Sequence, residues 1–442
     1  MTTDAIPASG RAPRQTVAAG TARPRVILVQ DGARLRYALA LALQSAGLLG
    51  TMHTDWYAQR GTLAARFANV MARLPHPAGQ RLAGRCAAGL DGSRIVASNW
   101  TTLVGRLCET RTAQEEELYI RRSRAVARQV LRDGWRDATA LAGFVRNIDP
   151  LLCEGARAHG ITVILDQMIA PVAVEARTAQ RQAALWPGWQ KPVDPFGPAL
   201  MRSVERRSWA AADRITCASD YVRQGLIGEG VEEDRISVMP YPIDTDTFQY
   251  RDRSARQGPV RIGFVGTVSL RKGAPAFLRI ARELDPKLAE FVMVGPSLLE
   301  EARLARERGA VRLAGAVPAM AIPDWLASFD VFLFPSTCEG SAGAVMEAMA
   351  TGLPVVTTPE SGTVVRDGLE GFVHGCEDID GMAVSIARLI ADPTLRLWMG
   401  RAARRRVESM TIARYGTLWR ALLQPDAHPR ETGAISRRAS PA

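Results

Sequence analysis

The segment 331–356 constrains the fold of this chain more than any other part of the sequence, because it joins two apolar runs through a loop of small residues. Val331–Phe334 is a short continuous apolar run, as found in strands that are buried on both faces of a parallel sheet. A helix is expected to begin near Ala342 and to end before Gly352, and a second strand is expected from Pro354. The segment therefore predicts a strand–helix–strand unit of an α/β sheet.

The loop and the first helical turn of this unit are suited to an anion. Gly340, Ala342, Gly343 and Ala344 have little or no side chain, so unpaired backbone N–H groups at the helix start can approach a phosphate. Glu347 lies about one and a half turns into the helix. There its carboxylate can accept hydrogen bonds from the two vicinal hydroxyls of a ribose. A phosphate site beside a ribose site predicts a nucleotide ligand.

The complete string from Pro335 to Val356 resembles the Glu-x7-Glu signature of the family-four retaining glycosyltransferases, which have the GT-B fold. The resemblance implies that Glu339 lies beside the transferred sugar as a catalytic residue, and that Glu347 holds the nucleotide ribose. Ser341-Ala342 departs from the pattern, since the family usually has an aromatic residue and a glycine there. We therefore expect a differently shaped turn at the phosphate. The competing interpretation is an ordinary strand and helix with solvated glutamates.

Two further segments resemble the end of the N-terminal domain in the same family. Residues 205–222 predict a helix, a short strand and a second helix capped by Ser219. Residues 236–244 predict a strand that ends in a proline-rich turn, with Tyr241-Pro242 in place of the usual Asn-Gly. The polar, arginine-rich run 251–257 is then the linker between two domains.

Apolar runs that alternate with helical patterns predict two α/β units in tandem. The expected fold class is α/β of the GT-B type, with two Rossmann-like domains facing each other across a cleft. The predicted boundaries are a disordered tail at 1–24, an acceptor-side N-terminal domain at 25–250, a donor-binding C-terminal domain at 258–405, a helix at 406–423 that packs back on the first domain, and a second disordered tail at 424–442.

The first domain is expected to begin with a strand at 26–30, a turn at Gly32 and a helix at 35–46. The resemblance implies that Gly32 lies near the diphosphate and the acceptor, although the usual second glycine is absent. Family members often have a histidine near the reacting sugar, and Asp166 occupies that place here. Asp166 could bind a hydroxyl or act electrostatically, or it could simply cap a helix. His53 is another candidate for the missing histidine.

The diphosphate of a nucleotide sugar becomes the leaving group, so its growing negative charge must be neutralised. The turn Ser269–Gly273 carries two cations, and the resemblance implies that Lys272 contacts the diphosphate. The partner arginine of the family is missing, because Thr267 stands in its place. Arg271 is a candidate replacement. The alternative is that both cations are solvated charges of a surface turn.

The nucleotide base is expected near Gly295, Ala316 and Val317, because open α/β sheets bind ligands at the carboxyl ends of their strands. Two Asp-x-Asp runs, at 244–246 and 378–380, match the acidic pair of metal-dependent transferases. Both lie in turn or helix-start contexts, and we expect them to be structural. No metal and no cofactor are therefore expected.

The net charge of +11 is concentrated in the first half of the chain, where residues 1–200 hold 25 Lys and Arg against 15 Asp and Glu. An anionic membrane surface or a phosphorylated substrate could use this charge. Nucleic acid is not expected as a partner, because no helix-turn-helix, zinc or stacking pattern accompanies the basic residues. One helical face carries four arginines and is either a membrane-surface face or a solvated one: Arg121, Arg124, Arg128 and Arg132.

The six cysteines are scattered, which favours reduced thiols, and no apolar run approaches about 18 residues. A signal-peptide pattern is also absent from the start. We therefore expect a cytoplasmic location, with peripheral attachment to the inner face of the membrane as an alternative.

These observations together predict a retaining, metal-independent glycosyltransferase, of the hexosyltransferase type, that moves a sugar from a nucleotide-diphosphate sugar to a glycan, lipid-linked or small-molecule acceptor. A nucleotide-sugar epimerase or a phosphorylase on the same fold remains an alternative. A two-lobed sugar-binding protein without turnover is a further alternative from a different class.

Overall fold

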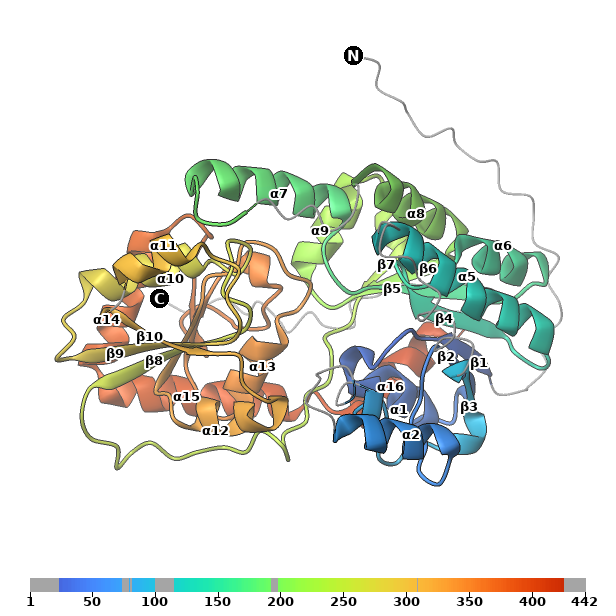
Figure 1. Ribbon diagram of the computed structural model, residues 1–442, viewed down its shortest axis with the longest axis horizontal. Helices are drawn as coiled ribbons and strands as arrows, with labels where there is room; N and C mark the ends of the chain where they lie inside the picture. Colours follow the sequence, from blue (N-terminus) through green and yellow to red (C-terminus); the bar gives the residue numbers. More distant parts are fainter. Residues whose placement is uncertain are drawn as a thin grey trace, which may run out of the picture.

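The structure is a computed structural model that describes residues 24–73, 79, 82–99, 115–191, 198–307 and 309–424. It consists of two α/β domains, one in the blue to green part of the chain and the other in the yellow to orange part (Figure 1). The tails predicted at the two ends of the chain lie outside the described residues, apart from residue 24 and residue 424.

The first domain contains a seven-stranded parallel sheet in the order β3-β2-β1-β4-β5-β6-β7. Its central strands are apolar and buried, because helices cover both faces of a parallel sheet. The strands are β1 Val26–Val29, β2 Leu49–Thr54, β3 Ile95–Ala97, β4 Ala140–Phe144, β5 Thr162–Gln167, β6 Arg214–Cys217 and β7 Ile236–Val238. The helices are α1 Ala38–Ser45, α2 Leu63–Ala72, α5 Glu115–Asp133, α6 Pro150–Ala158, α7 Val172–Leu185, α8 Pro198–Ala211 and α9 Asp220–Gly228.

The second domain contains a six-stranded parallel sheet in the order β10-β9-β8-β11-β12-β13. The strand and helix predicted around residues 331–352 are confirmed by β11 and α13. The strands are β8 Val260–Val265, β9 Ala289–Val294, β10 Val311–Gly315, β11 Val331–Phe334, β12 Val355–Thr357 and β13 Gly371–Val373. Its helices are α10 Ala274–Glu283, α11 Glu301–Leu304, α12 Ile322–Ala327, α13 Gly343–Ala350, α14 Ile379–Ala391 and α15 Pro393–Glu408, and they are followed by α16 Ile412–Leu422.

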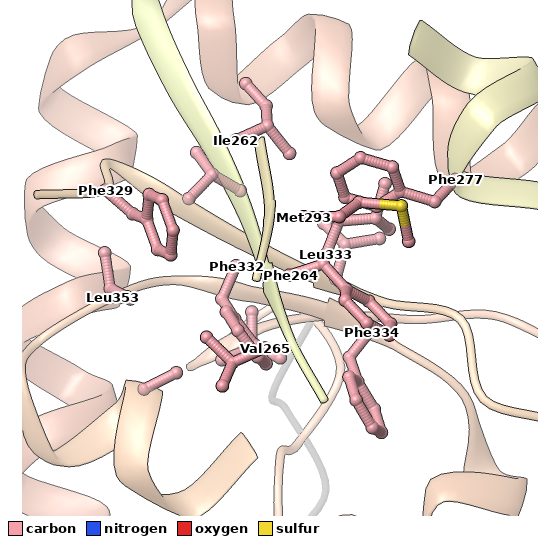
Figure 2. Close-up of a cluster of buried hydrophobic side chains, with 14 of the residues drawn as sticks. Ile262, Phe264, Val265, Phe277, Met293, Phe329, Phe332, Leu333, Phe334 and Leu353 are labelled. Atoms are coloured by element: carbon pink, nitrogen blue, oxygen red, sulfur yellow. The ribbon is translucent and has the colours of Figure 1, made fainter. Parts of the chain in front are cut away.

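An aromatic core supports the strand ends of the second domain (Figure 2). The rings of Phe264 and Phe334 stack with their centroids 5.4 Å apart. Phe277 of α10 packs edge-on against Phe264, with a centroid distance of 5.9 Å. These fully buried side chains fix β8 and β11 relative to each other. Loops that leave the two strands therefore start from rigid points.

Both sheets reverse their strand order at one point, between β1 and β4 in the first domain and between β8 and β11 in the second. Loops on either side of such a reversal diverge to opposite faces of the sheet, which leaves room for a ligand at the carboxyl ends of the strands. The two reversal points are therefore the expected places for substrate in this fold.

The last helix of the described chain returns to the first domain, where α16 packs on α1 (Figure 1). Tyr415 and Trp419 of α16 are fully enclosed in the same core as Leu28 of β1. The preceding helix, α15, instead packs on α13 of the second domain. The boundary expected between residues 405 and 406 thus falls inside α15, and the chain changes domain only between α15 and α16.

The helix predicted at 35–46 begins later than expected, at Ala38. The three residues before it, Leu35, Arg36 and Tyr37, have φ angles of 48°, 50° and 63° and form a short left-handed turn. Such angles are costly for residues other than glycine, and they are usually found where the surrounding structure requires them. The conformational preferences of these three residue types do not predict a left-handed turn.

The arginine-rich face predicted on one helix is present on α5. Val126 and Val130 are buried, whereas Arg121, Arg124 and Arg128 are exposed. Arg124 also lies 3.4 Å from a carboxylate oxygen of Asp149. Among the described helices, none combines the length and the apolar character required to cross a membrane.

Candidate functional site

The loop that follows β11 brings the second domain's helix α13 to the carboxyl edge of its sheet. Gly343 is exposed, and a Cβ atom placed on it would meet nothing within 4 Å. Ala342 is the N-cap of α13, and its carbonyl accepts the first bond of the helix from Val345 N–H at 3.0 Å. The N–H groups of Gly343 and Ala344, in the first turn, are therefore the donors that α13 offers to an anion.

Two other residues predicted to contact phosphate have protein partners in the structure. Ala342 N–H donates to the carbonyl of Ser361 at 3.0 Å and is no longer available to a ligand. Gly340 is buried against the first domain, where an added Cβ would lie 1.6 Å from the carbonyl oxygen of Met168. Ser219 Oγ donates to the Gly340 carbonyl at 2.5 Å. The glycine at position 340 thus permits close contact between the domains.

Three predicted residues do meet at the carboxyl ends of β8 and β11. The cation turn, residues 269–273, places Lys272 Nζ 2.9 Å and Arg271 Nη1 2.7 Å from Glu339 Oε1. Lys272 also lies 4.9 Å above the ring of Phe334. The turn is fastened to the β11 loop because Thr337 N–H donates to the Arg271 carbonyl at 2.8 Å. Two cations share one carboxylate, so the cluster keeps a positive charge for an anion.

Glu347 lies on α13 and faces the first domain. Arg36 Nη2, in the left-handed turn before α1, approaches Glu347 Oε1 at 3.7 Å. Burial raises the pKa of Glu347, and Arg36 opposes the shift. The Arg36 guanidinium also lies 5.7 Å from the ring centroid of Phe248. Sequence reasoning missed Arg36, because nothing in its local pattern indicates a contact with the other domain.

A second charged group surrounds Gly32 at the carboxyl end of β1. Gly32 has a φ of +70° and its N–H donates to Asp55 Oδ1 at 2.9 Å. Arg85 Nη1 lies 2.5 Å from Asp55 Oδ2. Burial and the neighbouring Asp55 raise the pKa of Asp31 to about 6. Burial also acts to raise the pKa of Asp55, but Arg85 and the hydrogen bonds from Asp31 and Gly32 together lower it.

Asp55 and Arg85 were also missed by sequence reasoning. One signal was available, since Asp55 directly follows the predominantly buried strand β2 and therefore had to lie at the carboxyl edge of the sheet. Arg85 lies in a loop, and its proximity to Asp55 follows only from the path of the chain.

Asp166, predicted as a catalytic residue, does not join either charged group. It is 1% exposed, and its two carboxylate oxygens accept hydrogen bonds from Tyr241 at 2.5 Å and Thr216 at 2.8 Å. Burial raises its pKa to about 6, although both hydrogen bonds favour the charged form. Both carboxylate oxygens of Asp166 are thus engaged by neighbouring side chains of the first domain.

His53 is enclosed as well, being 3% exposed. Burial lowers its pKa to about 4, which favours the neutral ring at physiological pH. Its Nδ1 atom lies 3.8 Å from Asp133, on the side of β2 that α5 covers. It contacts neither of the two charged groups.

The residues predicted for the base lie together at the carboxyl edge of the second sheet. Gly295 N–H donates to the Gly315 carbonyl at 2.9 Å, which joins the ends of β9 and β10. A Cβ on Gly295 would lie 2.0 Å from the Gly266 carbonyl, so only glycine allows this approach. Ala316 is exposed and Val317 is half-buried beside them. This edge therefore leads directly to Gly266 and the adjacent Lys272 side chain.

Both Asp-x-Asp runs have local structural partners. Asp244 Oδ1 accepts from the N–H groups of Asp246 and Thr247, each at 3.0 Å. Asp378 caps α14 by accepting from Gly381 N–H at 3.0 Å, and Asp380 pairs with Arg279. Over the described ranges, no three His, Cys, Asp or Glu side chains gather in a way that could hold a metal ion.

The second domain matches a known protein family. Residues 259–392 match the family described as "Glycosyl transferases group 1". This part of the chain is therefore similar to the group 1 glycosyl transferases. The resemblance to family-four glycosyltransferases, which was carried by the Glu-x7-Glu string in this same region, is thereby confirmed.

Curated proteins similar to this chain include D-inositol 3-phosphate glycosyltransferase of Kribbella flavida, 28% identical over 47% of the chain and 55% of that protein. The GDP-mannose-dependent alpha-(1-6)-phosphatidylinositol monomannoside mannosyltransferase of Mycolicibacterium smegmatis is 28% identical over 46% of the chain and 60% of that protein. The chain thus spans between about half and three fifths of the length of these relatives.

Solved structures extend the likeness to nearly the whole chain. Anabaena HepE in complex with UDP superposes with a TM-score of 0.59 at 13% identity, covering 90% of this chain and 99% of that one. Sucrose-phosphate synthase from Thermosynechococcus elongatus gives a TM-score of 0.61 at 16% identity, with the same coverage. The predicted GT-B fold is confirmed.

Proposed function

We propose that this protein is a retaining, metal-independent glycosyltransferase that transfers a sugar from a nucleotide-diphosphate sugar to a glycan, lipid-linked or small-molecule acceptor. The observation that carries the proposal is the meeting of Arg271, Lys272 and Glu339 at the carboxyl ends of β8 and β11. The open first turn of α13 and Glu347 lie on the same loop–helix unit. The group 1 family match and the UDP complex of a structural neighbour support a nucleotide sugar as donor.

The donor's charge can be met without a metal ion. Lys272 and Arg271 supply two positive charges, and the N–H groups of Gly343 and Ala344 add the positive end of a helix dipole. Glu339 now neutralises part of this charge. An incoming diphosphate would compete with Glu339 for the two cations, which frees this carboxylate for the hydroxyls of the sugar.

Retention of configuration normally involves either an enzyme nucleophile or a reaction in which donor and acceptor meet on one face of the sugar. Asp166, the carboxylate predicted to lie near the sugar, is enclosed by Tyr241 and Thr216. It is therefore not available as a nucleophile. This favours a mechanism in which the departing phosphate oxygen takes the proton from the acceptor hydroxyl.

The acceptor is proposed to bind at the first domain, around the charged group of Gly32, Asp55 and Arg85. This group lies at the carboxyl edge of the first sheet, beside its reversal point between β1 and β4. Carboxylates such as Asp31 and Asp55 suit the hydroxyls of a sugar or polyol, and Arg85 suits a phosphate on it. Two curated relatives are named for phosphate-bearing inositol acceptors, which supports the same class here.

The test is a calorimetric binding panel of UDP-, GDP- and ADP-sugars with wild type, Glu347→Ala and the control Glu408→Ala. We expect one nucleotide class to bind wild type and the control equally. Glu347→Ala should bind it about tenfold more weakly, because it loses hydrogen bonds from the ribose to a charged acceptor. Equal binding by Glu347→Ala, or no binding of any sugar nucleotide by wild type, would refute the proposal.

A second experiment measures turnover by the same proteins after treatment with EDTA. It tests whether transfer is independent of metal and whether the protein instead catalyses one of the alternative reactions. Transfer should persist in EDTA, and a loss that Mg²⁺ restores would contradict the metal-free mechanism. Conversion of the donor to another sugar nucleotide without acceptor would instead identify an epimerase. A requirement for free phosphate would identify a phosphorylase.

A further inference from the structure

One segment of the first domain reaches across to the second domain and ends there. Helix α7 begins beside α8 in the first domain and runs toward α11, as the top of Figure 1 shows. The residues after it, 186–190, lie on the second domain. We call residues 172–190 the interdomain arm. Trp186 and Trp189 in its tip pack against the second domain's core, with their ring centroids 5.6 Å apart.

Backbone hydrogen bonds hold the tip of the interdomain arm in place. Gln190 pairs with Leu299 in an antiparallel bridge, and Glu300 N–H donates to the Trp189 carbonyl at 2.8 Å. The Arg303 guanidinium donates to the carbonyl of Pro187 at 3.1 Å. The contact is therefore a specific one that combines apolar burial with backbone pairing, and it resembles a short added strand rather than a loose surface contact.

The same tip reaches the cation turn of the candidate site. Gln190 Oε1 accepts a hydrogen bond from Leu270 N–H at 2.9 Å. Leu270 is buried and directly precedes Arg271 and Lys272. A side chain supplied by the first domain thus fixes the backbone of the turn that carries both cations.

The base of the arm is anchored in the first domain by a partly buried ion-pair network. Arg146 lies 2.6 Å from Glu175 of α7 and 2.7 Å from Glu205 of α8. Glu205 also accepts from Val172 N–H at 2.9 Å, at the first residue of the helix. Burial raises the pKa of Glu175, and both Arg146 and Arg271 oppose the shift, so the field of Arg271 reaches the base of the arm as well.

We propose that the interdomain arm is a positioning element for the donor's diphosphate, and that Gln190 acts by fixing the cation turn through Leu270. This inference rests on the proposed glycosyltransferase function. Loss of the Gln190 acceptor leaves the Leu270 N–H without its partner in the arm. The turn can then shift, and a displacement of Arg271 and Lys272 by a fraction of an ångström weakens their contact with phosphate groups.

The experiment compares wild type with Gln190→Ala, with Gln190→Glu, which keeps an acceptor oxygen, and with Gln180→Ala on the exposed side of α7. Calorimetry measures binding of inorganic pyrophosphate, UDP and GDP, and turnover is measured with the donor that wild type uses. We expect Gln190→Ala to bind pyrophosphate about five- to tenfold more weakly and to lose kcat/KM by a similar factor, as for one lost hydrogen bond. Gln190→Glu should recover most of both quantities, and Gln180→Ala should match wild type.

Hydrogen–deuterium exchange of the ligand-free proteins separates this inference from the proposed function. Peptides that cover residues 266–277 should exchange faster in Gln190→Ala than in wild type or Gln180→Ala, whether or not any nucleotide binds. Unchanged exchange in these peptides overturns the inference. The inference is also overturned if Gln190→Ala exchanges faster but binds pyrophosphate and turns over substrate as well as wild type does. In that case the position of the turn would have no effect on the site. Absence of nucleotide binding by wild type counts against the proposed function alone.

Discussion

Two carboxylates that look equivalent in the sequence have different environments in the structure. Glu339 lies between Arg271 and Lys272, with two cations within 2.9 Å. Asp166 is enclosed and accepts hydrogen bonds from the neutral hydroxyls of Tyr241 and Thr216. In the first environment the carboxylate can exchange its cationic partners for a ligand, whereas in the second, burial raises the pKa of Asp166.

A pH dependence of stability follows for Asp166. Its pKa is about 6 in the folded protein against 3.8 in the unfolded chain, so the folded state keeps a proton that the unfolded chain releases. This group therefore lowers stability as pH rises from about 4 to 6, by about 3 kcal/mol. Thermal melts from pH 4 to 7 should show a smaller decline for Asp166→Asn than for wild type. Parallel pH profiles of Asp166→Asn, wild type and the exposed control Asp234→Asn would contradict this.

The sequence could predict single residues only where a motif carried them. Glu339, Glu347 and Lys272 were predicted because a long string fixed their places, and the structure brings Glu339 and Lys272 together. Arg36 and Arg85 come from segments without a motif, and only the path of the chain sets their positions. Gly340 and Ala342 were assigned to phosphate because small residues suit both an anion and a close contact between backbones, and the sequence alone does not distinguish the two.

At the scale of secondary-structure elements, the buried parallel strands were predictable and the connections were not. Continuous apolar runs located β1 and β11 almost to the residue, because these strands are buried at every position. The left-handed turn before α1 gave no signal, since it uses residues other than glycine. The role of the interdomain arm could not be predicted from the sequence either, because a helical pattern does not indicate which domain the end of the helix contacts.

The arginine-rich linker joins elements of the second domain. Arg253 donates to the carbonyls of Phe329 at 2.5 Å, Leu326 at 3.2 Å and Thr351 at 2.8 Å. It thereby closes the carboxyl ends of α12 and α13, at a cavity on the edge of the sheet opposite the cation turn. One side chain thus donates to carbonyls at the ends of two helices, in addition to the backbone N–H groups that Leu326 and Thr351 already accept from.

Arg253→Ala should therefore lower the free energy of unfolding by about 2–4 kcal/mol, since three acceptors of a charged donor are left without it. Arg253→Lys should recover only part of this loss, because an ammonium cannot reach divergent carbonyls as a guanidinium does. Chemical denaturation measures the effect, and Arg251→Ala, an exposed neighbour, is the matched control. Equal losses for Arg253→Ala and Arg251→Ala would show that the carbonyl contacts contribute little.

At the scale of the whole molecule, the first domain is built from two distant parts of the chain. Residues 24–240 supply its sheet, and α16 completes its core with Tyr415 and Trp419. Trp419 is fully enclosed and packs against the apolar side chains of α1 and β1. The two domains are therefore connected by the linker and again by the chain between α15 and α16.

Trp419→Ala should destabilise the first domain by about 3–5 kcal/mol, as expected for removal of a buried tryptophan. Scanning calorimetry should show an earlier unfolding transition, and limited proteolysis should cleave first within residues 24–240. Trp398→Ala removes the same side chain from a position on α15 that is 45% exposed, and it should leave the transition nearly unchanged. The prediction fails if the two variants melt alike.

The return of α16 also sets the order in which the protein can mature on the ribosome. The second domain holds all of its strands between residues 260 and 373 and can fold as soon as α15 has emerged. The sheet of the first domain is synthesised earlier, but its apolar groove for Trp419 stays open until translation passes residue 422. The first domain is thus synthesised first but completes its folding last. A nascent chain stalled before α16 would expose that groove to chaperones.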